Sequence, residues 1–187
     1  MKSRHSASLL LVWRVAELEA RRLRASMIEP IHLIIGLCKI VDLDLPELVS
    51  KDAPHREEIL EESLREIRRV RTIFRVAGVN AKALRRNLRR VFVGERLDSR
   101  NSTQLRRSSA SRDIFADAEH FAEATNQAVY PVHLLYAVLI FTDKDRDAVL
   151  ADADISKKRL LDVAKRDIFA FQMQAISPSK AARARWN

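Results

Sequence analysis

The chain has 187 residues and a mass of 21.5 kDa, and its 47% hydrophobic and 32% charged composition allows a sizeable core under a well-solvated surface, which excludes disorder along the whole length. Its three glycines, at positions 36, 78 and 94, are too scattered for a Walker A loop or a dinucleotide fingerprint, and the single cysteine, Cys38, excludes an internal disulfide and a thiolate zinc site. The net charge is +9, and residues 82–112 alone carry +8, from ten basic and two acidic side chains.

Low glycine and proline with abundant alanine, leucine and arginine favours an all-helical protein. The apolar run at residues 9–13 is too short for a signal-peptide core, and the run at 31–41 is interrupted by His32 and Lys39. We therefore expect a soluble, cytoplasmic protein.

The first two elements are predicted as helices that face a core. Apolar residues between positions 9 and 23 recur at steps of three and four, which places them on one helix face. Residues 28–40 are apolar nearly all round, and Pro30 suits a first helical turn, where its missing N–H costs nothing. This second helix is predicted to be central and buried.

A loop over residues 42–54 and two further helices are expected next. Residues 54–77 carry an apolar stripe, with glutamates in the early turns and arginines in the later ones, which complements the helix dipole. Gly78 is suited to terminate this helix, and Asn80 to cap the following one. In that following helix we expect the apolar residues Leu84, Leu88 and Val91 to point inward.

The second half of the chain shows a similar order of elements. Residues 94–109 are polar, basic and aperiodic, which indicates a linker. Helical periodicity resumes over residues 114–122, a second buried helix follows Pro131, and a short helix beginning at Asp143 or Asp145 comes next. Ser156 is suited to cap a last helix.

Two stretches of the chain align without a gap. Residues 28–37 are IEPIHLIIGL and residues 129–138 are VYPVHLLYAV. The motif they share consists of Pro30, His32 and Leu33 in the first copy and of Pro131, His133 and Leu134 in the second. Alanines upstream correspond as well, Ala16 and Ala20 to Ala118 and Ala122, and so do residues 77–84 and 153–160 downstream. Landmarks that recur in the same order predict a duplicated helical unit.

The two copies differ in length. The first has an insertion of about 25 residues relative to the second, within the interval of roughly 42–70. The second has Asp154 where the first has Gly78, and aspartate adopts the left-handed backbone less easily than glycine. The predicted segments are a first repeat at 6–93, a linker at 94–108, a second repeat at 109–172 and a basic tail at 173–187.

This pattern resembles the N-terminal repeat domain of Clp ATPases. It consists of an alanine-spaced helix, a Pro-x-His-Leu helix, and a short helix ending before a capped, leucine-bearing helix, all of it twice. The resemblance covers roughly residues 6–171. It implies an all-α fold of two pseudo-symmetric four-helix repeats, packed as one domain, with an extra helical insertion in the first. It also implies a non-enzymatic, cofactor-free domain that recruits substrate polypeptides or adaptors to a Clp-type unfoldase or protease, either free-standing or as part of a larger ATPase.

Three side chains on the second predicted helix invite a chemical interpretation. Glu29-x-x-His32 has the spacing found in di-iron carboxylate helices, but the second copy has Tyr130 in place of the glutamate. We therefore favour a structural role in which His32 and His133 bond to the backbone near a helix start. Cys38 is expected to be a small buried apolar residue rather than a nucleophile.

A cationic stripe is predicted on the helix after Asn80, from Arg85, Arg86, Arg89 and Arg90. Such a stripe could bind an acidic protein surface, bind nucleic acid, or remain solvated or paired with the glutamates of the preceding helix. The expected exposed apolar residues are Val12, Phe92, Phe141 and Trp186. We favour a protein-binding module that holds a peptide in a groove between the repeats. The alternatives are a small basic nucleic-acid-binding protein and, less favoured, a helical metalloenzyme.

Overall fold

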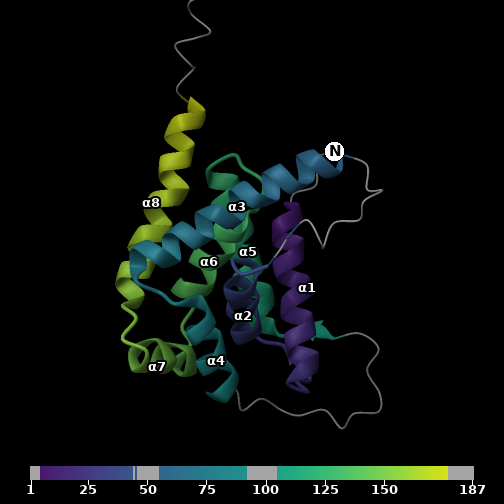
Figure 1. Ribbon diagram of the computed structural model, residues 1–187, viewed down its shortest axis with the longest axis vertical. Coiled ribbons are helices and arrows are strands. Elements are labelled where there is room, and N and C mark those ends of the chain that lie inside the picture. The colour runs from purple at the N-terminus through teal and green to yellow at the C-terminus, as the bar shows by residue number, and fades with distance from the viewer. Residues whose placement is uncertain (1–4, 44, 46–54, 92–104, 177–187) are drawn as a thin grey trace, which may run out of the picture.

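The computed structural model describes residues 5–43, 45, 55–91 and 105–176 of the chain, with side chains given up to residue 170. Within these residues the protein is all-α, as predicted (Figure 1). The helices are α1 (Ala7–Arg22), α2 (Pro30–Ile40), α3 (Arg56–Ala77), α4 (Ala81–Val91), α5 (Ser109–Ala124), α6 (Pro131–Ile140), α7 (Lys144–Asp152) and α8 (Lys157–Ile176). The described residues also contain two-residue strands, β1 (Met27–Ile28) and β2 (Arg106–Arg107). None of the described helices is both long and apolar enough to cross a lipid bilayer.

Helices α1–α4 and α5–α8 form two repeats that use the same backbone devices. Ser6 caps α1 by accepting a 3.3 Å hydrogen bond from the backbone N–H of Leu9, and Ser108 caps α5 in the same way from Ser111 at 3.2 Å. Each of these helices is followed by a left-handed residue, Arg24 at φ 56° and Asn126 at φ 52°. These correspondences keep the 102-residue offset that relates Ala16 to Ala118.

The third helix of each repeat also ends alike. Gly78 has φ 77° and Asp154 has φ 55°, so aspartate does take the left-handed position that glycine fills in the first repeat. In both cases the following N–H, of Val79 or Ile155, reaches back 2.8 Å to a carbonyl five residues earlier. This is the bond that closes a helix in a Schellman motif.

The fourth helices begin as the sequence predicts. The Asn80 side chain accepts a 3.0 Å hydrogen bond from the N–H of Ala83, and the Ser156 hydroxyl accepts one of 3.2 Å from Arg159. For the short helix α7 the cap is Asp143 rather than Asp145, because the Asp143 carboxylate accepts from the N–H of Arg146 at 3.0 Å.

Short parallel pairings tie the repeats to each other. Strand β1 of the first repeat pairs with β2, which leads into the second, and His5 forms a bridge with Val129. The N–H of Ser108 donates to the Ile28 carbonyl, and the N–H of Ser6 donates to the Val129 carbonyl, each at 3.2 Å. The segment before the first helix of each repeat is thus held by the segment before the second helix of the other.

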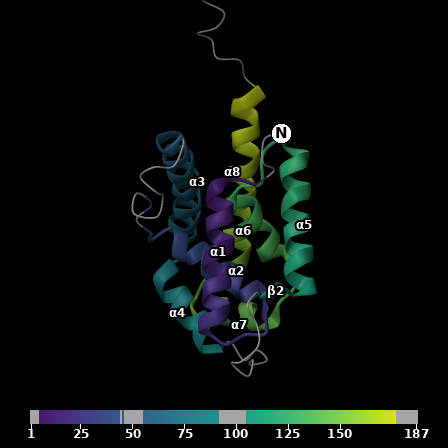
Figure 2. The same cartoon turned by 90° about the vertical axis from the view of Figure 1, so that its right-hand side faces the viewer.

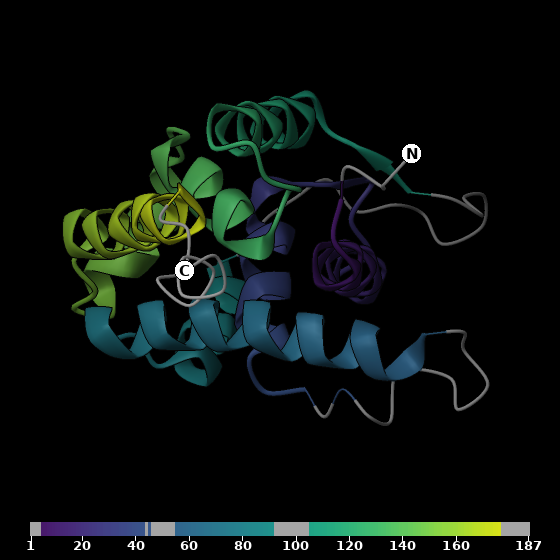
Figure 3. The same ribbon diagram turned by 90° about the horizontal axis from the view of Figure 1, so that it is seen from above.

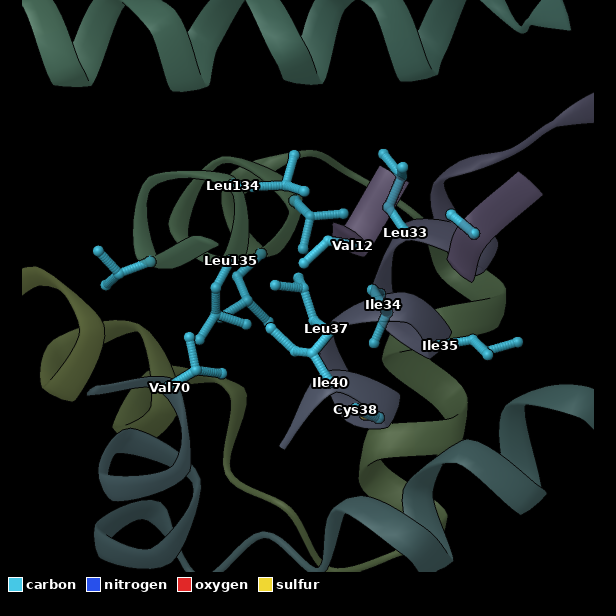
Figure 4. Packing of buried hydrophobic residues seen from close by; sticks show 14 of the residues in the cluster. Val12, Leu33, Ile34, Ile35, Leu37, Cys38, Ile40, Val70, Leu134 and Leu135 are labelled. Carbon is cyan, nitrogen blue, oxygen red and sulfur yellow. The ribbon is translucent and has the colours of Figure 1, made fainter. Parts of the chain in front are cut away.

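The core is centred on α2 and α6, the helices that carry the Pro-x-His-Leu motif. Leu33 and Leu37 of α2 meet Leu134 and Leu135 of α6, and Val70 of α3 closes the cluster (Figure 4). The motif residues are buried in both copies. Burial of these large aliphatic side chains is the main favourable term for the packing of the two repeats.

Helix α3 is the main departure from symmetry. It has 22 residues, whereas its counterpart α7 has 9, and it extends across both repeats from α1 to α8 (Figure 3). A 2.8 Å bond from Arg69 Nε to Asp167 Oδ2 fixes it to α8. The predicted insertion at residues 42–70 therefore includes most of a helix that bridges the repeats.

The predicted segment boundaries meet the structure in three places. Strand β2 lies within the predicted linker at 94–108, whose residues 94–104 are outside the described part of the chain. Helix α8 continues to Ile176, past the expected end of the second repeat at residue 172. The rest of the predicted tail, and residues 46–54 of the predicted loop, are outside the described residues.

Candidate binding surfaces

The two motif histidines act as local caps for their own helices. His32 Nδ1 accepts a 2.9 Å hydrogen bond from the backbone N–H of Glu29, and His133 Nδ1 accepts one of 3.0 Å from Tyr130. The sequence predicts this bond to the backbone near a helix start for both histidines. Both rings are fully buried, and desolvation lowers the pKa of each to about 4. Both are therefore neutral at pH 7.

Cys38 and the Glu29-x-x-His32 motif, the remaining candidates for chemistry from the sequence, show no reactive arrangement among the described residues. Cys38 is fully buried in the α2 core, and burial raises the pKa of its thiol to about 12, so it is not a thiolate at physiological pH. The described residues contain no cluster of three histidine, cysteine, aspartate or glutamate side chains that could hold a metal ion. Among the described residues, the Glu29-x-x-His32 spacing is not completed into a metal site.

The prediction that Arg85, Arg86, Arg89 and Arg90 of α4 form one exposed cationic stripe is wrong for two of the four. Arg85 is buried and lies 3.7 Å from the Asp42 carboxylate. Arg89 donates from Nε to Glu19 of α1 at 2.8 Å and is largely covered. Arg86 and Arg90 are exposed, and together with Lys82 they follow one another at four-residue spacing. Two of the four predicted arginines therefore join helices, and the exposed stripe is Lys82, Arg86 and Arg90.

The apolar surface also differs from the expectation. Val12 is completely buried rather than exposed, Phe141 is half-buried, and Phe92 and Trp186 lie outside the described residues. Val91, expected to point inward, is 39% exposed. The large apolar side chains with the greatest exposure are Leu10 at 52% and Leu18 at 56%, both on α1, and Phe169 at 50% on α8.

Helix α1 presents its outer face between α3 and α5 (Figure 2). Its inner face, with Leu9, Ala16 and Ala20, packs into the core as predicted. Trp13 lies at the α5 side, where its ring meets that of Phe115 edge-on at 5.6 Å between centroids. Leu10 and Leu18 lie outside the core-facing side of the helix and are more than half exposed.

The inserted helix α3 contributes a buried carboxylate at the start of α1. Glu66 is 4% exposed, and its Oε2 accepts hydrogen bonds from Ser6 Oγ, at 2.7 Å, and from Ser8 Oγ. Burial raises the pKa of Glu66. Beside it is a small hollow lined by Glu62, Arg65, Glu66, Arg69 and Tyr130. Its lining combines acidic and basic side chains of α3 with Tyr130, which precedes α6, so we interpret the hollow as part of the packing interface between α3 and the second repeat.

Arg146 of α7 is a structural residue that the sequence analysis missed. Its side chain is fully buried, and its guanidinium donates to the carbonyls of Val138 and Phe141 at the end of α6, the latter at 2.7 Å. It also contacts Asp147, which Lys157 of α8 binds at 2.7 Å. Its position in the sequence does not indicate burial, because it is one of several charged residues in a short helix.

The exposure of Leu10 and Leu18 could have been predicted from the sequence, since both fall outside the predicted inner face of α1.

Comparisons with known proteins place the fold. The N-terminal domain of Hsp104 from Candida albicans superposes with a TM-score of 0.60 at 14% identity, over 86% of this chain and 88% of that one. The N-terminal domain of the caseinolytic protease associated chaperone ClpD from Arabidopsis thaliana gives 0.57 at 17% identity, over 86% and 94%. A structure from preliminary investigations of a malarial protein secretion system gives 0.59 at 18% identity, over 89% and 95%. No family model and no curated protein matches the sequence. The predicted resemblance is thereby confirmed at the level of the fold.

Proposed function

We propose, from the premise that this chain has the fold of the Hsp104 and ClpD N-terminal domains, that it is a non-catalytic module that binds polypeptides. In this proposal it recruits substrates or adaptors to a Clp-type ATP-driven unfoldase or protease in the cytoplasm. Hydrolysis of ATP would be carried out by that partner.

The observation that carries this proposal is the contrast between buried chemistry and exposed apolar surface. His32, His133 and Cys38, which could serve in catalysis, are enclosed in the core. Leu10 and Leu18, by contrast, are more than half exposed on one helix. An arrangement of this kind favours binding through surface contacts over catalysis.

The direct test uses the purified full chain and two partners. Fluorescently labelled, chemically unfolded casein is titrated with the protein and followed by anisotropy. A purified Clp-type ATPase, together with its peptidase subunit and ATP, is assayed for casein degradation with and without the protein. We expect saturable casein binding and a change in degradation rate that depends on the protein. The absence of both effects would refute the proposal.

The exposed stripe of Lys82, Arg86 and Arg90 keeps a nucleic-acid-binding function as the second candidate. Contacts to phosphates release counterions, so such binding weakens steeply with salt. Titration of a labelled DNA duplex between low and moderate salt separates the two candidates. Tight duplex binding with a steep salt slope, together with no casein binding, would favour the second.

A further inference from the structure

We propose that the outer face of α1 is a docking surface for an acidic amphipathic helix of a protein partner. The surface consists of the exposed Leu10 and Leu18, with the partly buried Leu11 beside them and Arg14, Arg21 and Arg22 around them. This inference rests on the proposed function and specifies the surface and the chemistry of the partner. Leu10 and Leu18 are more than half exposed among the described residues, and Figure 2 shows α1 in front of α2 and α6.

The second repeat supplies an internal control for the fold. Inner residues of α1 keep their character in α5: Val12, Trp13 and Ala16 correspond to Ile114, Phe115 and Ala118. The outer residues change completely. Leu10, Leu11 and Leu18 correspond to Arg112, Asp113 and His120, all three of which are exposed on α5. Since α5 occupies the equivalent place with a polar outer face, the exposed Leu10 and Leu18 of α1 are not needed for the fold, whereas Leu11 still packs against the core.

The spacing of the leucines suits a helix as the partner. The exposed edge of Leu11, which is otherwise packed against the core, and Leu18 are seven residues apart, the repeat with which one helix packs along another. Leu10 and Leu18 are separated by about 12 Å along the axis, or two turns of a partner helix. Arg14 lies between them and is 68% exposed.

The charge of the face defines the sign of the partner. Both acids of α1 are buried in ion pairs, Glu17 with Arg14 and Arg21, and Glu19 with Arg89. The exposed charged residues of α1 are therefore all arginines: Arg14, Arg21 and Arg22. A partner with carboxylates beside its apolar stripe is complementary to this face. Two exposed leucines separated by an arginine offer too small an apolar area for stable insertion into a membrane, which favours a protein partner.

The test uses a synthetic three-heptad peptide as a probe, with leucine at the a and d positions and glutamate at e and g, labelled with fluorescein. The full-length chain should bind it saturably, and more weakly as salt increases. The double variant L10R/L18H, whose new residues are those that α5 carries at the same positions, should bind at least about tenfold more weakly, because two apolar contacts are lost. Its melting temperature should be unchanged.

Two controls sharpen the result. Phe169→Ser removes an equally exposed apolar side chain on α8, at the other side of the molecule, and should leave the affinity unchanged (Figure 1). The Arg22→Glu variant alters exposed charge alone and should weaken binding even if L10R/L18H proves less stable. A peptide with lysines in place of its glutamates should bind weakly or not at all.

Three outcomes with the peptides would overturn the inference. The wild type does not bind the acidic peptide, or L10R/L18H binds it as tightly as the wild type does, or the wild type binds the lysine peptide as tightly as the acidic one. Sedimentation showing a dimer that L10R/L18H dissociates would assign the face to a second copy, and pelleting with phosphatidylserine vesicles without peptide binding would assign it to lipid. If casein binds but the acidic peptide does not, or if casein binds wild type and L10R/L18H equally, the proposed function stands and this surface is wrong. If the peptide binds and casein and the ATPase do not, the surface stands and the proposed function fails.

Discussion

The first and second repeats can be compared position by position, because helix-capping residues at corresponding places recur in the same order along the chain. Both repeats share three features: serine caps at Ser6 and Ser108, histidine bonds at the starts of α2 and α6, and left-handed closures at Gly78 and Asp154. The repeats differ in the outer faces of α1 and α5 and in the lengths of α3 and α7. Backbone groups that need a partner are thus satisfied in the same way twice, whereas exposed side chains differ between the copies.

The histidine pair is the shared device with the largest expected effect. The folded-state pKa of both His32 and His133 is lowered from 6.5 to about 4. Unfolded chains therefore bind more protons than folded ones between these values, and stability is present above pH 6.5 and lost as the pH falls toward 4. We expect the two histidines together to reduce the unfolding free energy by roughly 4 kcal/mol between pH 6.5 and 4.5.

Urea unfolding at a series of pH values measures this loss, and His32→Gln and His133→Gln should each remove about half of the slope. Glu19 lies near His32 and Arg69 near His133, and these charges act on the two rings with opposite sign. The pKa of Glu66 is raised by burial, so its protonation increases the unfolding free energy of the protein as the pH falls and opposes the effect of the histidines. A flat profile in the wild type would contradict the expected titration of both rings, and a slope that one histidine alone determines would show that the repeats are not equivalent here.

The arginines that bind the ends of α2 and α6 differ between the repeats in how deeply they are buried. Arg146 is fully buried against the Val138 and Phe141 carbonyls, whereas Arg71 is exposed and donates to the Val41 carbonyl at 3.2 Å from Nε. We expect Arg146→Ala to cost about 3 kcal/mol, because buried carbonyls lose their donor, and Arg71→Ala to cost less than about 1 kcal/mol. Chemical denaturation followed by circular dichroism measures both, and similar losses for the two variants would contradict this assignment.

The left-handed closures should respond with opposite signs. Gly78→Ala places a side chain at φ 77° in open space, so the expected cost is backbone strain alone, about 1 kcal/mol. Asp154→Gly relieves the same strain in the second repeat and should raise stability by up to about 1 kcal/mol. Paired thermal melts test both, and a destabilised Asp154→Gly variant would mean that the carboxylate itself stabilises this turn.

Much of the fold could be predicted because periodicity and capping residues are local signals. The helix over residues 54–77, the caps at Asn80 and Ser156 and the burial of the Pro-x-His-Leu motif all follow from spacing within a few residues. The pairing of β1 with β2 could not be predicted, since two-residue strands carry no pattern and their partners are 79 residues apart.

The surface was harder to predict because burial depends on distant partners. Arg85 and Arg89 look solvent-facing in sequence, and only the positions of Asp42 and Glu19 in space explain why they are covered. Val12 falls just outside the apolar spacing of α1, yet the close approach of α2 at Gly36 buries it. A Cβ at Gly36 would lie 2.8 Å from the Val12 carbonyl oxygen, so the two helices meet too closely for any larger residue.

The arginines of α4 now divide into two pairs with different expected effects. Replacing Arg86 and Arg90 with glutamate should change the unfolding free energy by less than about 0.5 kcal/mol, because both are exposed. Association with an acidic partner should nevertheless slow at low salt, and the difference should shrink as salt shortens the screening length to about 3 Å at 1 M. Stopped-flow mixing with the acidic three-heptad peptide measures the rate. Replacing Arg89 instead should destabilise the fold, because Glu19 would lose its partner within a largely buried pair. If replacing Arg86 and Arg90 with glutamate leaves the association rate unchanged at low salt, these two side chains are only a solvated surface of α4. Electrostatic steering of the partner then depends on the arginines of α1.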